Sequence, residues 1–230
     1  MSTPHPAAGA TADAPARHRG RGRVLQTAHG SRAEAFGPVE WGLLTGIAGI
    51  WGSSFLFIDV GLEALEPAVV SLARLVLGTG ALALIPRARQ RLRGEDLPRA
   101  ALLGLVWMAI PLLLFPLAQQ WVASSVAGMV NGAVPLFSAL IATVLLRHLP
   151  RPGQAVGLAV GFLGVVAITW PSARGADASL LGVSLLLLAV ALYGLATNLA
   201  VPLQQRYGGA PVLLRAQLVA LVVIAPFGFA

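Results

Sequence analysis

The chain has 230 residues, of which 57% are hydrophobic and 11% are charged, and its formal net charge is +7. A soluble domain of this length could not bury so much apolar surface, whereas a bilayer could cover it, so the composition argues against a soluble enzyme. All 16 basic residues are arginines, and most lie in clusters beside apolar segments, which indicates membrane topology rather than a nucleic-acid-binding face. Cysteine is absent, which excludes disulfides and thiolate metal sites.

Residues 1–37 form an N-terminal tail of different composition, rich in Ala, Pro, Gly and Arg. Such a composition cannot build a core, so we predict a disordered tail on the cytoplasmic side, with its arginines near anionic lipid headgroups. The first apolar segment begins too late and is too long for a secretory signal.

Seven apolar segments follow the tail, each close to the roughly 20 residues that a membrane-spanning helix needs. The predicted helices cover residues 40–62, 67–86, 100–118, 124–146, 153–171, 179–203 and 211–230. Pro111 and Pro116 in the third segment and Pro135 in the fourth should bend or loosen those helices. The expected fold class is therefore an all-α integral membrane protein, a bundle with about seven transmembrane helices.

The arginines between the segments predict the orientation. Thirteen lie in the tail and in the second, fourth and sixth connections, whereas the alternate connections hold only Arg174. By the positive-inside rule the N-terminus is cytoplasmic, and we expect a multi-pass protein of the cell inner membrane.

Two further arginines lie inside apolar segments. Arg74 is seven residues into the second segment, and Arg215 has a similar position in the seventh. A charge within a spanning helix costs several kcal/mol, so such a residue usually faces a protein interior or a water-filled cavity. The two arginines therefore predict a polar interior between helices.

The segments around these arginines also resemble each other. Trp51-Gly52 and Tyr193-Gly194 stand 142 residues apart, Pro67 and Pro211 stand 144 apart, and the two arginines 141 apart. Five helices separate the two units, and because five is odd the second unit must enter the membrane in the opposite sense. Inverted repeats of this kind are found in many secondary transporters. Chance similarity among Ala-, Gly- and Leu-rich helices is the alternative on these residues alone.

Four stretches carry a resemblance to a known family, namely Ile50–Phe55, Pro67–Arg74, Ala123–Ala142 and Gln154–Val166. With them the chain resembles the EamA-like family of the drug/metabolite transporter superfamily over roughly residues 40–225. The resemblance implies a ten-helix fold of two inverted five-helix repeats that moves small metabolites across the cytoplasmic membrane.

On this basis residues 40–171 are the first five-helix repeat, and residues 179–230 are an incomplete second repeat of two helices. The family usually has a glutamate just after the fourth helix, where this chain reads Arg147-His148-Leu149-Pro150. The role of that glutamate is therefore not carried over. The chain also ends inside the seventh helix of an expected ten. We expect either a C-terminally truncated piece of a longer protein or a protein whose second half comes from a partner.

Six residues are candidates for substrate binding or gating. They are Arg74, Asp59, Asn131, Trp51, Ser54 and Arg215. Asp59 and Arg74 differ in depth by about one helical turn, so they could form an ion pair that either locks two helices or acts in gating or substrate binding. Asn131 could cross-link helices or line a cavity, and Ser54 could pack or hydrogen-bond a substrate.

No enzyme motif is present, the four histidines lie outside the apolar segments, and neither a metal site nor a cofactor is expected. The sequence predicts a secondary transporter of small polar metabolites or drugs that works by alternating access. Its partners would be a small-molecule substrate and the lipid bilayer, without nucleic acid. One alternative is a half-length membrane subunit that binds a second chain, as a homodimer or with another half-transporter. The other is a membrane scaffold or lipid-binding module without transport.

Overall fold

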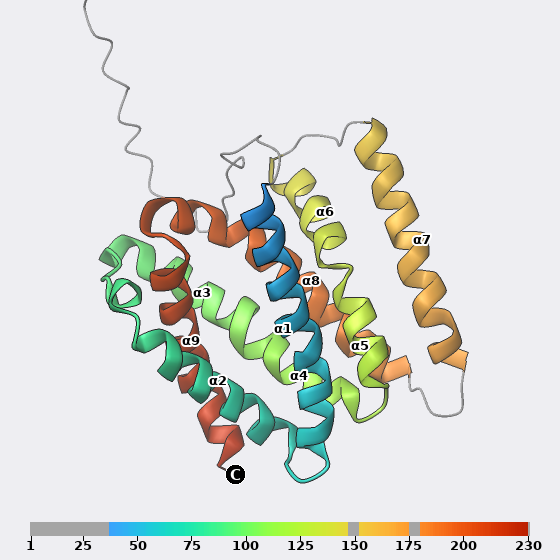
Figure 1. Cartoon of the computed structure of the whole chain (residues 1–230), viewed down its shortest axis with the longest axis horizontal. Coiled ribbons are helices and arrows are strands. Elements are labelled where there is room, and N and C mark those ends of the chain that lie inside the picture. The colour runs from blue at the N-terminus through green and yellow to red at the C-terminus, as the bar shows by residue number, and fades with distance from the viewer. Residues whose placement is uncertain (1–36, 147–151, 175–179, 230) are drawn as a thin grey trace, which may run out of the picture.

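A computed structural model describes residues 37–146, 152–174 and 180–229 of the chain. Within these ranges the chain is helical and contains no strand (Figure 1). The predicted tail and the connections after the fourth and fifth apolar segments lie outside the described residues.

Each of the seven predicted apolar segments is helical. Five are single helices, namely α1 (Pro38–Leu62), α2 (Pro67–Ala83), α7 (Pro152–Arg174), α8 (Leu180–Tyr207) and α9 (Gly209–Gly228). The third segment consists of α3 (Leu97–Leu103), the π-helical turn η3 (Gly104–Ala109) and α4 (Ile110–Gln119). The fourth consists of α5 (Ser124–Asn131) and α6 (Val134–Leu146). Two short 3₁₀ helices, η1 (Pro86–Arg89) and η2 (Gly94–Asp96), connect the second segment to the third.

Length and composition make most of these segments suitable for a bilayer. Among the described residues, five helical stretches are long and apolar enough to cross a membrane, whereas α2 and the apolar part of α7 (Pro152–Ala167) are shorter. A spanning helix satisfies its own backbone hydrogen bonds, which is why helices can cross a bilayer. The chain is an all-α membrane protein, as its sequence predicts.

Prolines explain where the third and fourth segments are irregular. Pro111 follows directly on the π-helical turn η3, and Pro135 lies just after the break between α5 and α6. Proline has no N–H and clashes with the carbonyl four residues earlier, which disrupts the preceding turn of an α-helix. Pro116 lies inside α4 without ending it. The predicted loosening is therefore confirmed at the first and last of these three prolines.

The described connections between helices lie at two ends of the bundle. We call the end with the connection 84–96 and the turn at Gly208 the Arg-rich end. The opposite end holds Glu63–Glu66 and residues 120–123. Arg206 contacts Asp96 at the Arg-rich end, and Ser124 contacts Asp59 at the opposite end.

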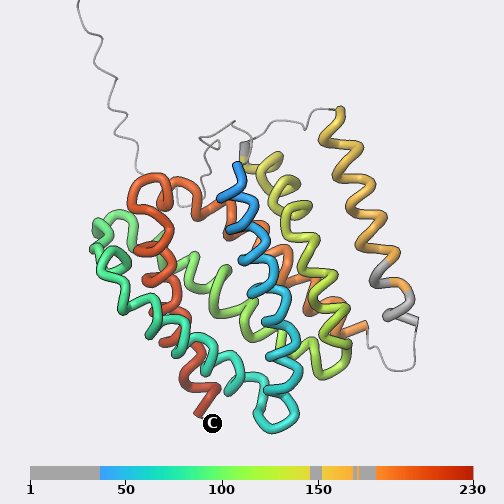
Figure 2. Tube along the Cα trace, viewed as in Figure 1, coloured from blue at the N-terminus to red at the C-terminus, as the bar shows by residue number. Residues whose placement is uncertain are grey.

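Two apolar clusters hold the bundle together. One lies where α2, the third segment, α8 and α9 meet, and the other joins α1, α4, α5 and α8. α2 packs along α9, α8 packs against both α4 and α6, and α7 lies at the edge of the bundle (Figures 1 and 2). Fully buried members of the two clusters include Leu75, Leu103, Leu199, Val212, Val130 and Leu186.

The contact between α6 and α8 is close because of Gly194. A Cβ atom at Gly194 would lie 2.7 Å from the Phe137 Cβ and 2.8 Å from the Ser138 backbone nitrogen. Hydrogen bonds reinforce the contact: Asn198 Nδ2 donates to the Ser138 carbonyl at 2.8 Å, and the Ser138 and Thr197 hydroxyls lie 2.8 Å apart. Small residues that let backbones approach, together with polar groups between helices, are typical of packing in membranes.

We therefore expect Gly194→Ala to lower the free energy of unfolding by about 1–3 kcal/mol, because an added methyl group overpacks a rigid backbone contact. Thermal unfolding of the purified protein in detergent measures the effect. Gly46→Ala is the matched control, since no described atom beyond its own stretch of helix lies within 4 Å of the position where its Cβ would be. Gly46→Ala should leave stability unchanged or raise it by a few tenths of a kcal/mol. Equal melting temperatures for the two variants would contradict the close contact at Gly194.

Candidate functional site

A pocket of about 550 Å³ lies between α1 and α2. It occupies the half of the bundle nearer the opposite end, because it uses the second half of α1 and the first half of α2. Pro67 opens α2 in the favoured first position of a helix, which sets where Arg74 falls along it. The pocket is lined by Ile50, Ser53, Ser54, Phe57, Gly61, Leu65, Val70, Ala73, Arg74 and Leu77.

Arg74 is the charged group of this pocket. Its Nη2 atom donates a hydrogen bond to the Ser54 hydroxyl at 2.8 Å, so two of the predicted site residues meet. Arg74 is half-buried and lies about 10 Å along α2 from its start, at 1.5 Å per residue. The ion pairs found within the described residues involve Arg93 and Arg206 and not Arg74. A hydroxyl cannot neutralise a guanidinium, so within the described part of the chain Arg74 is a cation without a counterion.

An aromatic group packs behind the pocket. The rings of Phe55 and Phe115 lie 5.3 Å apart, and those of Phe115 and Tyr193 lie 5.7 Å apart, between centroids. All three side chains are buried, and Tyr193 is close enough to Arg74 to interact with it electrostatically. These residues do not line the pocket; they form an aromatic wall in the apolar interior near Arg74, and a low-dielectric surrounding strengthens an interaction between Arg74 and an anion.

Sequence reasoning did not select Phe115 or Tyr193 as site residues. The sequence pointed to Tyr193 only as the counterpart of Trp51 in the proposed repeat. Phe115 carries no signal in the sequence, because only the packing of α4 against α1 and α8 brings its ring between the other two.

Asp59 does not pair with Arg74 in this conformation. It is exposed near the end of α1, and its Oδ2 atom accepts a hydrogen bond of 3.4 Å from the Ser124 hydroxyl. Asp59 thereby connects α1 to the start of α5 at the rim of the bundle. The ion pair with Arg74 stays a prediction for another conformation.

The remaining three candidates lie away from this pocket. Trp51 is on α1 with its side chain about half exposed and is not part of the lining. Asn131 ends α5, and its buried Oδ1 atom has no hydrogen-bond partner among the described residues. Arg215 reaches the Arg-rich end, where its Nη2 atom donates to the carbonyls of Arg89 and Gln90 at 3.3 and 3.4 Å. Such reach towards a membrane boundary is the behaviour of a snorkelling side chain.

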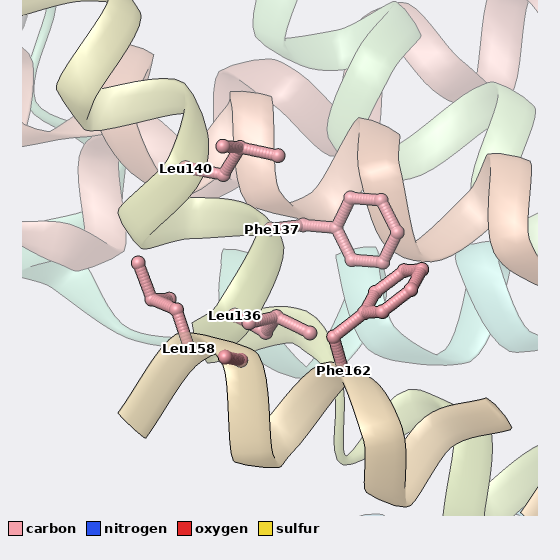
Figure 3. A pocket seen from close by; sticks show the side chains of 6 residues that line it. Leu136, Phe137, Leu140, Leu158 and Phe162 are labelled. Atoms are coloured by element: carbon pink, nitrogen blue, oxygen red, sulfur yellow. The ribbon is translucent and has the colours of Figure 1, made fainter. Parts of the chain in front are cut away.

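A second pocket, of about 290 Å³, lies between α6 and α7. Figure 3 shows Phe137 of α6 and Phe162 of α7 on facing sides of it, with Leu158 nearby on α7. Its six lining residues are all apolar, so it offers no group that could orient a polar substrate. The pocket at Arg74 is therefore the better candidate for a site that recognises polar molecules.

Metal ligands do not gather at either pocket. In the part of the chain that the structure describes, no group of three or more His, Cys, Asp or Glu side chains is placed to hold a metal ion. The absence of a cofactor remains a prediction.

The helices define a multi-pass membrane protein, and the pocket between α1 and α2 holds one cation, Arg74, and two serines in a largely apolar lining. Residues 40–170 match the EamA-like transporter family, and the chain belongs to that family. Family and relatives together support a membrane transporter rather than an enzyme.

Three relatives show the extent of the similarity. The chain is 24% identical over 188 residues to an "uncharacterized transporter" of Archaeoglobus fulgidus, which covers 82% of this chain and 67% of the relative. It is 30% identical over 190 residues to a "probable terminal-alkyne amino-acid exporter" of Streptantibioticus cattleyicolor, covering 81% of this chain and 62% of that protein. It is 33% identical over 135 residues to the "uncharacterized inner membrane transporter YedA" of Escherichia coli, covering 56% and 42%. The chain thus spans about two thirds or less of the length of these relatives. No solved structure matches the chain significantly.

Proposed function

We propose that the protein is a secondary transporter that moves small polar metabolites or drugs across the cytoplasmic membrane by alternating access. The observation that carries this proposal is Arg74, a half-buried cation in an open pocket, with a serine partner and with no counterion among the residues that the structure describes. An uncompensated charge at this depth is costly, which favours a functional role over a structural one.

The pocket also favours a class of substrate. A guanidinium has five N–H donors in a planar fork, and Ser54 accepts from one of them, so a carboxylate could be bound through others. Ile50, Phe57 and Leu77 supply an apolar lining beside this fork. We therefore propose substrates that combine a carboxylate with a small apolar part, such as amino acids. The relative from Streptantibioticus cattleyicolor, whose name refers to an amino-acid exporter, supports this class.

The packing of the helices is compatible with alternating access. α2 and α9, the proposed counterparts that follow Pro67 and Pro211, lie against each other along the bundle. Secondary transporters with inverted repeats bind their substrate near the contact between the repeats and move one repeat against the other. On this proposal the contact between α2 and α9 is where the two repeats would move against each other.

Binding of matched compounds tests the substrate class. We expect amino acids with small apolar side chains to raise the melting temperature of the purified protein, since a ligand at 100 times its Kd stabilises by about 2.7 kcal/mol. The corresponding amines, which lack the carboxylate, should have no effect. Uptake or efflux of the same compounds by cells that express the complete gene then tests transport. Equal stabilisation by acids and amines would contradict a carboxylate site.

We also propose that the Arg-rich end is cytoplasmic, because of the asymmetry of the arginines. In this cysteine-free chain, Gln90→Cys and Ala64→Cys place single thiols at exposed positions on the two sides. An impermeant thiol reagent added to intact cells should label Ala64→Cys at least about tenfold more than Gln90→Cys, and permeabilised cells should label both. Preferential labelling at position 90 in intact cells would reverse the topology.

A second candidate is a half-length subunit that needs a partner chain. The exposure of α1 favours it, since every residue from Val39 to Gly52 is exposed, including the large side chains of Trp41, Ile47 and Ile50. On this proposal, vesicles that hold only the 230-residue chain would not accumulate substrate, and a second chain would restore uptake. Saturable uptake by the chain alone would exclude it.

A further inference from the structure

The last turn of α8, from Leu203 to Tyr207, continues the helix but lies between Pro202 and Gly208. Pro202 precedes it and cannot donate the backbone hydrogen bond to the Asn198 carbonyl, which weakens the helix at this point. Gly208 follows it with φ of 81°, a conformation that favours glycine, and α9 begins at the next residue. The Gly208 N–H donates to the Gln204 carbonyl at 2.8 Å, so the turn is closed at its end, and the weak point at Pro202 makes it a small element that can move about one hinge.

Asp96 of η2 holds this turn at the Arg-rich end. Its Oδ2 atom accepts hydrogen bonds from Arg206 Nη1 and from the Tyr207 hydroxyl, each at 2.7 Å. The Tyr207 hydroxyl in turn accepts from the Arg93 backbone N–H at 3.2 Å. The Asp96 side chain is only 15% exposed. Short, charge-assisted bonds to a shielded carboxylate are stronger than ion pairs on a surface.

Glu95, the residue next to Asp96, makes only weak contacts with the same region. It lies 3.6 Å from Arg206 and 3.8 Å from Arg93, and its side chain is 67% exposed. Exposed pairs with such distances contribute little. Asp96 and Glu95 are therefore adjacent acids with the same charge and very different contacts.

A second contact holds α8 on the other side of Pro202. Arg99 is buried, and its Nε atom donates to the Leu199 carbonyl at 2.9 Å. The segment from Arg93 to Arg99 thus contacts α8 both before and after the weak point. Directly beneath these contacts, Leu199 and Leu203 are buried in the apolar cluster of α2, the third segment and α9.

We propose that the last turn of α8 is a gate at the Arg-rich end and that Asp96 latches it shut. This inference rests on the proposed transport function. The latch joins a connection of the first proposed repeat to a helix of the second, so movement of one repeat against the other strains these bonds. The pocket at Arg74 lies in the other half of the bundle, and Leu203, beneath the latch at the Arg-rich end, is only 2% exposed. Release of Asp96 lets the turn rotate about Pro202 and exposes Leu203.

Thiol labelling tests the gate without any substrate. Leu203→Cys places one buried thiol beneath the latch, and Leu186→Cys places one in the other apolar cluster as a probe of general unfolding. Adding Asp96→Asn should raise the alkylation rate at position 203 at least about tenfold, since bonds to charged groups are lost. Glu95→Gln, the matched control, should leave the rate within about twofold. Position 186 should react at the same rate in all backgrounds.

Further variants distinguish opening of a gate from general destabilisation of the fold. Tyr207→Phe removes one of the two bonds to Asp96 and should raise the rate at position 203 by less than Asp96→Asn does. Pro202→Ala stiffens the hinge and should reduce the effect of Asp96→Asn. An unchanged rate at position 203, or an equal rise at positions 203 and 186, would overturn the gate. These rates are independent of substrate, so a failed carboxylate test would leave them interpretable, and a failed gate would leave the carboxylate site standing.

Discussion

Replacing Arg74 with alanine should reduce transport by about 10²- to 10⁴-fold, because loss of one partner from the shielded charge pair that we propose between Arg74 and a substrate carboxylate costs about 3–5 kcal/mol. Arg74→Lys should have an intermediate effect, since lysine keeps the charge but lacks the planar fork that binds a carboxylate through two bonds. The measurement is uptake or drug resistance in cells that carry the complete gene, with surface expression measured in parallel.

Two controls make the Arg74 result specific. Ser54→Ala removes the one hydroxyl that contacts the guanidinium and should have a smaller effect, because the charge remains. Asp59→Asn should leave transport close to that of the parent if Asp59 only contacts Ser124. A defect as large as that of Arg74→Ala would instead reveal their ion pair in another conformation. Normal transport by a well-expressed Arg74→Ala protein would show that Arg74 does not bind substrate and only anchors its helix.

Filling the pocket should be almost as damaging as removing its charge. Ala73 lines the pocket next to Arg74, so Ala73→Phe places a ring in the space of about 550 Å³ where we propose that substrate binds. We expect transport to fall at least about tenfold, the effect of 1.4 kcal/mol of lost binding.

Ala81→Phe is the matched control, since Ala81 is also exposed on α2 but does not line the pocket. The control should transport normally. Equal activity of the two phenylalanine variants, at equal surface expression, would place the substrate elsewhere.

The elements of the fold were predictable because their signals are local. A run of apolar residues predicts each spanning helix, and Pro67 marks the start of α2. Pro111 and Pro135 likewise predicted two irregular segments, since proline acts on the turn that precedes it. The division into residues 40–171 and 179–230 as two repeats stays a prediction.

The site was less predictable because it depends on which helix faces which. Arg74 and Ser54 were selected for their chemistry, and the packing of α1 beside α2 brings them together. Arg74 and Arg215 look equivalent in the sequence, yet one contacts a hydroxyl within the bundle and the other contacts carbonyls at its end. The difference arises because α2 and α9 have different neighbouring helices. The residue pattern along a single helix does not reveal which helices pack beside it. The contacts of Asp96 could not be predicted for the same reason, since its partners are more than 100 residues away in the sequence.

The π-helical turn at Gly104–Ala109 has a consequence for the ancestry of this protein. A bond that closes over five residues encloses one more residue than an α-helical bond, so α3 and α4 are out of phase by about 100° relative to an uninterrupted helix. Losing one residue within the turn would regularise the helix and rotate Phe115 away from Phe55 and Tyr193. Homologues that keep this aromatic wall should therefore keep the extra residue, and those that lost it should carry a one-residue deletion in the third helix.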